Sequence, residues 1–68
     1  MADMNAVWAG VRTYMMSGRT NPPPASFVQT IRSLGLTASE KDWLAQKARA
    51  WPGNPGVGQQ TANDITQA

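Results

Sequence analysis

Two clusters of proline and glycine divide this chain and limit the length of any helix that it can form. The first cluster contains Pro22-Pro23-Pro24, and the second begins at Pro52-Gly53. Proline has no amide hydrogen and disfavours a helical conformation in the residue before it, so we expect no helix to run through either cluster. A chain of 68 residues has room for one domain at most. The fold is therefore expected to be built from short elements.

The first segment has the apolar period of a helix. Asp3 is a plausible N-cap, and Gly18 can adopt the left-handed conformation that ends a helix. Spacings of three and four residues, which mark one helix face, separate its apolar side chains: Met4, Val7, Trp8, Val11 and Met15. The sequence predicts a helix over about residues 4–17.

Residues 19–25 contain the three prolines and are predicted to form a semi-rigid linker. Ser26 can then cap a second helix, predicted over 26–34, and Gly35 can end it. The apolar face of this helix is expected to contain Phe27, Val28, Ile31 and Leu34. Such a short helix is not stable alone in water, so it has to pack on its neighbours.

A third helix is predicted over 38–51 by the strongest local signal in the sequence. Thr37 and Glu40 have the spacing of a capping box, in which each side chain accepts a hydrogen bond from the other residue's backbone amide. Its inner face is expected to consist of Leu44, Ala48 and Trp51.

The remaining residues, 52–68, have only Val57 and Ile65 as sizeable apolar side chains. A segment with so little to bury is expected to be extended or disordered, or to become ordered on another surface. The predicted fold is thus all-α, with a three-helix domain in residues 1–51 and a C-terminal tail. Its expected core is Val7, Trp8, Val11, Phe27, Ile31, Leu34, Leu44 and Trp51.

The chain lacks the residues that most enzymes and metal sites require. It has no histidine and no cysteine, which removes the commonest acid/base group and the usual ligands of structural zinc. Of the four carboxylates, Asp3, Glu40 and Asp42 have expected roles at helix N-termini, and Asp64 lies in the predicted tail. We therefore expect no enzyme, metal site, cofactor or small-molecule substrate.

The aromatic residues favour protein binding instead. Three tryptophans in 68 residues is a high density, and tryptophan is enriched at the energetic centres of interfaces. Trp43 shares a helix face with Lys47, four residues later, where a cation–π contact can form. The residues expected to contact a larger protein or a second copy of the chain are Tyr14, Met16, Trp43, Lys47, Val57 and Ile65.

A small DNA-binding regulator of the helix-turn-helix type is the alternative hypothesis. Helices 26–34 and 38–51 have about the right length, and the residues that would contact DNA are Lys41, Lys47 and Arg49. The register fits poorly, because the position that requires a small residue holds Ile31 and a position that requires an apolar one holds Lys41. The formal net charge of +2 is also a weak nucleic-acid signal.

No apolar run approaches the roughly 20 residues of a membrane span, and helix 4–17 has a single cation, Arg12, so no membrane partner is expected. The N-terminal residues lack the pattern of a targeting signal, which predicts a cytoplasmic protein at synthesis. A minimal helical domain with an extended arm resembles the small accessory proteins of bacterial viruses. That resemblance implies a capsid or virion component, or a protein that binds a host factor.

Overall fold

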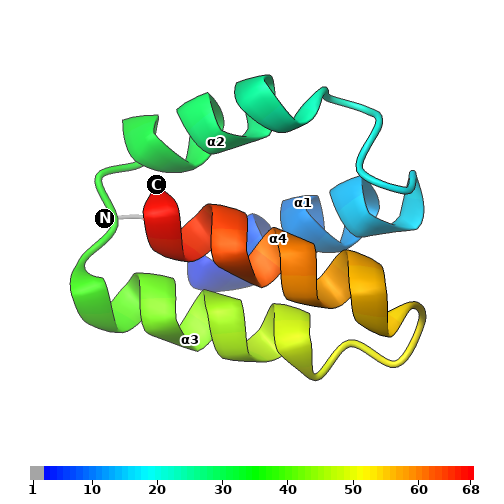
Figure 1. The fold of residues 1–68 in the computed structure, drawn as a ribbon. Coiled ribbons are helices and arrows are strands. Elements are labelled where there is room, and N and C mark those ends of the chain that lie inside the picture. Colours follow the sequence, from blue (N-terminus) through cyan, green and yellow to red (C-terminus); the bar gives the residue numbers. More distant parts are fainter. Residues whose placement is uncertain (1–2) are drawn as a thin grey trace.

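The computed structural model describes residues 3–68, which fold into four helices and contain no strand (Figure 1). The helices are α1 (Met4–Met16), α2 (Pro24–Ser33), α3 (Ala38–Arg49) and α4 (Pro55–Gln67). The predicted all-α class is confirmed. The prediction of three helices and a tail is wrong, because most of the predicted tail is α4.

Helix α4 occupies the centre of the fold. It packs against the other three helices and, in Figure 1, runs antiparallel to α3 with α2 on its other side. The backbone of α1 comes close to α3 and α4, whereas that of α2 comes close to α4 alone. The C-terminal segment therefore holds together helices that would otherwise share little packing.

Local capping and small side chains explain why the predicted tail is helical. The Asn54 side chain accepts hydrogen bonds from the amides of Gly56 and Val57, and Pro55 occupies the first helical position, where no amide hydrogen is needed. The buried residues of α4 follow helical spacing: Gly58, Thr61, Ala62 and Ile65. A search for large apolar groups misses this face, because only Ile65 is large.

The small residues allow α3 and α4 to pack closely. A Cβ atom at Gly58 would lie 2.4 Å from the Ala48 carbonyl oxygen, so only glycine fits there without a shift of the backbone. Ala45, Ala48 and Ala62 are all buried in the same core.

Several predicted helix ends are confirmed. The Asp3 side chain accepts a hydrogen bond from the Asn5 amide at 3.0 Å. The Thr37–Glu40 capping box is complete: the Glu40 amide donates to Thr37 Oγ1 at 3.1 Å, and the Thr37 amide donates to Glu40 Oε1 at 2.8 Å. Gly35, after α2, has a φ of +63°.

The start of the second helix was predicted wrongly. Helix α2 begins at Pro24, two residues before the predicted start, and Ser26 lies inside it rather than at its N-cap. Proline is compatible with the first turn of a helix, since the amide hydrogen that it lacks would have no intrahelical acceptor there. The linker is correspondingly shorter than the predicted 19–25.

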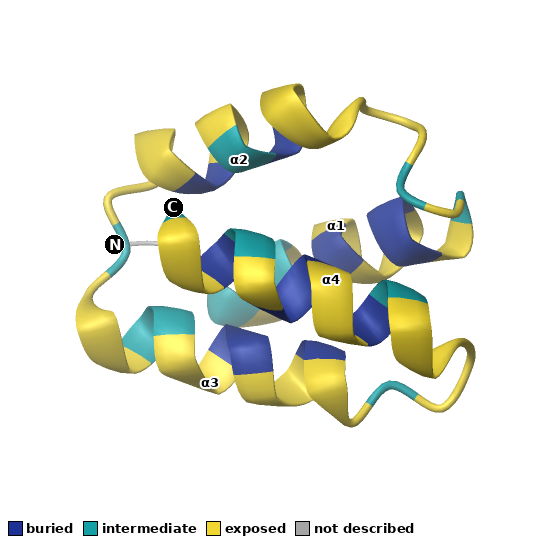
Figure 2. Cartoon of the chain, in the orientation of Figure 1, coloured by how far each residue is buried: buried dark blue, intermediate teal, exposed yellow. Residues whose placement is uncertain are grey.

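The core contains four of the predicted residues, Val11, Phe27, Ile31 and Leu44, all of them buried. Figure 2 shows that the buried parts of α2 and α3 face α4. Three more lie half-buried against it: Val7, Trp8 and Trp51. Leu34 was predicted to be buried but is 40% exposed, because it lies just beyond α2 at the edge of a groove described below.

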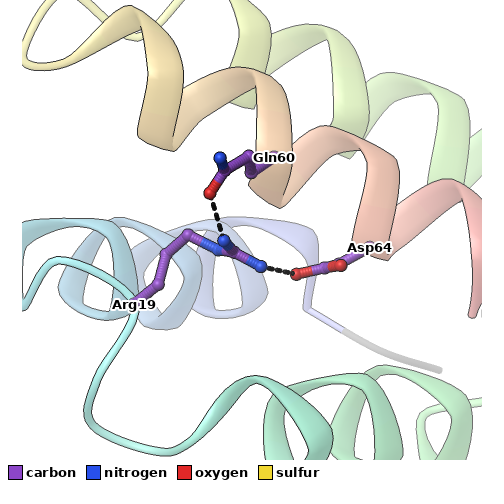
Figure 3. A network of polar contacts seen from close by, with 3 residues as sticks. All are labelled: Arg19, Gln60 and Asp64. Atoms are coloured by element: carbon purple, nitrogen blue, oxygen red, sulfur yellow. Dashed lines mark hydrogen bonds and ion pairs between the residues drawn. The ribbon is translucent and has the colours of Figure 1, made fainter.

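The first linker is fastened to α4 by a polar network. The Arg19 guanidinium donates hydrogen bonds to Asp64, at 2.6 Å, and to Gln60 (Figure 3). The Arg19 backbone is left-handed, with a φ of +63°, and its amide donates to the Tyr14 carbonyl oxygen at 3.1 Å. This network joins the end of α1 to the last helix.

Candidate functional site

An apolar groove separates α1 from α2. It has a volume of about 360 Å³, and the Cα atoms of the two helices stay more than 8 Å apart. Its lining consists mainly of apolar side chains: Ala6, Val7, Gly10, Val11, Tyr14, Pro22, Phe27, Thr30, Ile31 and Leu34. We call it the α1/α2 groove.

Two stacked aromatic rings join the helices at this groove. Tyr14 of α1 and Phe27 of α2 are parallel to within 1°, and their ring centroids lie 4.0 Å apart. Both side chains are buried, whereas Ala6 and Gly10 on α1 and Thr30 on α2 are exposed. The groove thus has a buried aromatic stack and an accessible rim.

The groove offers few polar groups to orient a ligand. No charged residue lines it, and the Thr30 hydroxyl donates to the Ser26 carbonyl oxygen at 3.0 Å. The Tyr14 hydroxyl is buried without a hydrogen-bond partner. Small-molecule sites usually combine apolar walls with several placed polar groups, so this groove is better suited to an apolar surface.

Burial also affects the ionisation of Tyr14. Loss of solvent raises the pKa of the phenol, and the positive charge of Arg19 offsets part of that rise. Burial by itself would lower the pKa of Arg19, but its hydrogen bond and ion pair with Asp64 leave that pKa raised. Tyr14 is therefore neutral and Arg19 is charged at neutral pH.

A second surface combines tryptophans and cations on α1 and α3. Lys47 Nζ lies 5.1 Å from the centroid of the Trp43 ring and 5.8 Å from that of the Trp8 ring. The guanidinium carbon of Arg12 lies 5.8 Å from the Trp8 ring. The contact between Trp43 and Lys47 expected from their spacing is present. We call these four residues the cation–aromatic surface.

Two of the predicted protein-binding residues are buried. Tyr14 is 1% exposed and Ile65 is 0% exposed, so the expectation that they face a partner is corrected. Tyr14 stacks on Phe27 inside the bundle, and Ile65 belongs to the inner face of α4. Ile65 was misplaced because the predicted tail is helix α4. Tyr14 was misplaced because its partner, Phe27, belongs to another helix.

The other predicted protein-binding residues are at least partly accessible. Met16 is 74% exposed and Trp43 is 38% exposed, and Lys47 is also exposed. Val57 is half-buried and packs against the core from α4. Met16 lines neither the α1/α2 groove nor the cation–aromatic surface, so the structure does not bring the six residues together.

The residues of the DNA-binding alternative do not converge. Lys47 lies over Trp8 of α1, whereas Lys41 borders a hollow shared with Thr66 of α4. Arg49 is two residues from Lys47 and so points about 160° away around the helix. The Cα atoms of α2 also stay more than 8 Å from those of α3, whereas the two helices of a helix-turn-helix pack together.

Comparison with protein-family models, curated proteins and solved structures found no match. The function therefore has to be inferred from geometry. Among residues 3–68, no group of three or more carboxylates is placed to hold a metal ion, and no helix is long and apolar enough to cross a membrane.

Sequence reasoning missed the groove and the place of Arg12. The sequence does contain a signal for the groove, because Ala6 and Gly10 are small residues four positions apart beside the apolar stripe of α1. That spacing alone does not predict a groove, because the groove also requires that α1 and α2 lie apart. Arg12 joins the cation–aromatic surface because it follows Trp8 by one helical turn.

Proposed function

We propose that this protein is a non-enzymatic binding component that receives the apolar face of a partner protein's helix in the α1/α2 groove. The observation that carries the proposal is an open apolar groove bordered by the exposed residues Ala6 and Gly10. Amphipathic helices bind apolar grooves in this way, with anchors spaced at one face.

Gly10 supports this choice of ligand. Glycine inside a helix costs about 1 kcal/mol relative to alanine. Packing within the fold does not require glycine at position 10, because a Cβ atom there would meet nothing within 4 Å. The close approach of another backbone is one use for such a position, and a helix lying along α1 would make it.

The exposure of Leu34 also supports a partner that fills the α1/α2 groove. A leucine at the rim, 40% exposed, gains apolar contact if a partner fills the groove. Contact with an extended strand would instead require a sheet edge, which residues 3–68 do not offer.

The test is a quantitative pull-down from the native host with the tagged full chain and a groove-filling variant. Gly10→Leu places a large side chain in the groove, and we expect it to abolish recovery of the partner. Gln29→Leu adds the same side chain to an exposed position of α2 outside the groove and serves as the matched control. Equal recovery with both variants would reject the groove as the binding site.

The partner can be a larger protein or a second copy of this chain. Sedimentation equilibrium separates these cases, because self-association through the groove makes the wild type dimeric and leaves Gly10→Leu monomeric. A role in the particle of a bacterial virus belongs to the same proposal. It predicts that the wild type, but not Gly10→Leu, enters assembled particles.

The DNA-binding regulator is the weaker proposal, because its cations lie on different sides of α3. Binding to duplex DNA that weakens steeply with salt, and that Lys47→Ala and Arg49→Ala both reduce, would support it over the groove.

A further inference from the structure

We infer that the cation–aromatic surface, Trp8, Arg12, Trp43 and Lys47, binds an acidic segment of a partner protein that also has an apolar side chain. This surface lies at the α1/α3 side of the fold and does not include the residues of the α1/α2 groove. The inference is thus independent of the function proposed for the groove.

The two cations are not neutralised within the described part of the chain. Arg12 and Lys47 are exposed, and the ion pair between Arg19 and Asp64 is the one salt bridge among residues 3–68. Arg12 and Lys47 instead lie over tryptophan rings, at the distances given above. A cation on an aromatic face keeps its positive charge and can still receive a carboxylate.

The four carboxylates of the chain are engaged elsewhere. Asp3 accepts amide hydrogen bonds at the start of α1, and Glu40 accepts one from Thr37. Asp42 accepts a hydrogen bond from the Gln46 side chain, and Asp64 binds Arg19. None of the four carboxylates forms an ion pair with Arg12 or Lys47, so both cations can receive negative charge from another molecule.

A neighbouring hollow adds an apolar component. It has a volume of about 250 Å³ and is lined by Met4, Ser39, Glu40 and Trp43. The exposed area of its lining is mostly apolar, and the Glu40 carboxylate at its border accepts a hydrogen bond from the Thr37 amide. Trp43 belongs both to the hollow and to the cation–aromatic surface. A partner segment with carboxylates on Arg12 and Lys47 can place an apolar side chain beside Trp43.

These features favour an acidic peptide over a nucleic acid. Proteins that follow a phosphate backbone use an extended row of cations. Here two cations share one surface, while Lys41 lies at the α4 side of α3. Two charges and an apolar hollow match a few carboxylates around an apolar side chain.

The test measures binding of the folded full chain to a fluorescein-labelled, glutamate-rich peptide with a single central leucine, which cannot present the apolar helix face proposed for the α1/α2 groove. Two double variants, Arg12→Gln/Lys47→Gln and Lys41→Gln/Arg49→Gln, each lower the formal net charge from +2 to zero. We expect the first to weaken binding by about tenfold or more, since charge-assisted contacts are lost, and the second by less than about threefold. Circular dichroism verifies that both variants fold.

Two further probes complete the experiment. A matched peptide with glutamine in place of glutamate should bind much more weakly, and Gly10→Leu should leave binding of the acidic peptide unchanged. Equal loss in the two double variants would show that only net charge matters and would overturn the inference. Tighter binding of single-stranded oligothymidylate than of the peptide, with the same dependence on Arg12 and Lys47, would also overturn it.

Discussion

The carbonyl oxygen of Ala48 faces the Cα atom of Gly58 so closely that a Cβ atom there would lie only 2.4 Å from it. This close approach sets the spacing of α3 and α4, the most extensively packed pair of helices in the fold. Helix α4 is also the one helix among residues 3–68 that packs on all the others.

The close approach predicts that Gly58→Ala destabilises the protein. The backbone of α3 has to move, and we expect the free energy of unfolding to fall by about 1–3 kcal/mol despite the better helix propensity of alanine. Gly56→Ala is the matched control, since its nearest neighbour would be Asn54 Oδ1 at an ordinary 3.5 Å. Urea denaturation of both variants measures the difference, and equal stabilities would contradict the packing described.

The burial of the Tyr14 phenol predicts a loss of stability at alkaline pH. Its pKa is raised by burial in the folded state, so the folded protein disfavours the phenolate more than the unfolded chain does. The stabilisation from this group is complete below the unfolded pKa of about 10 and is lost as the pH rises through the folded pKa. Tyr14 is the single tyrosine, so absorbance of the phenolate reports it alone.

Tyr14→Phe is the matched variant for that measurement. The hydroxyl is buried without a hydrogen-bond partner, so we expect the free energy of unfolding at neutral pH to stay unchanged or to rise by about 1 kcal/mol. The variant should also lose less stability than the wild type above about pH 10. Identical alkaline denaturation of the two proteins would show that Tyr14 is not buried as described.

The ion pair between Arg19 and Asp64 predicts a salt-dependent contribution to stability. Their side chains are only 19% and 20% exposed, so solvent screens the pair less than a surface pair. We expect Asp64→Asn to lower the free energy of unfolding by about 1 kcal/mol at low salt, and by less at high salt. Asp42→Asn, at an exposed carboxylate hydrogen-bonded to Gln46, should have a much smaller effect.

The first three helices could be predicted because their signals are local. Asp3 and the Thr37–Glu40 pair are caps that act within one helical turn, and both are formed. A local signal also existed for α4, namely Asn54-Pro55 at its start. It did not enter the prediction, because a hydrophobic criterion does not detect a helix that packs through glycine, alanine and threonine.

The two candidate surfaces also differ in how far the sequence alone could predict them. Trp43 and Lys47 lie in one helix, so their spacing alone was enough to predict their contact. The groove depends on how far α1 lies from α2, which residues distant in the sequence determine. Leu34 and Tyr14 were misplaced for the same reason, because their exposure depends on how α1 and α2 lie relative to each other.

Occupancy of the α1/α2 groove is measured most directly by thiol labelling at its rim. The chain has no cysteine, so Thr30→Cys introduces a unique thiol in the groove, and Gln29→Cys introduces one outside it on the same helix. The proposed function predicts that partner binding, or self-association at high concentration, slows maleimide labelling at position 30 by about tenfold or more and leaves position 29 unchanged. Labelling at position 30 that is equally fast in the free and bound protein would contradict binding in the groove.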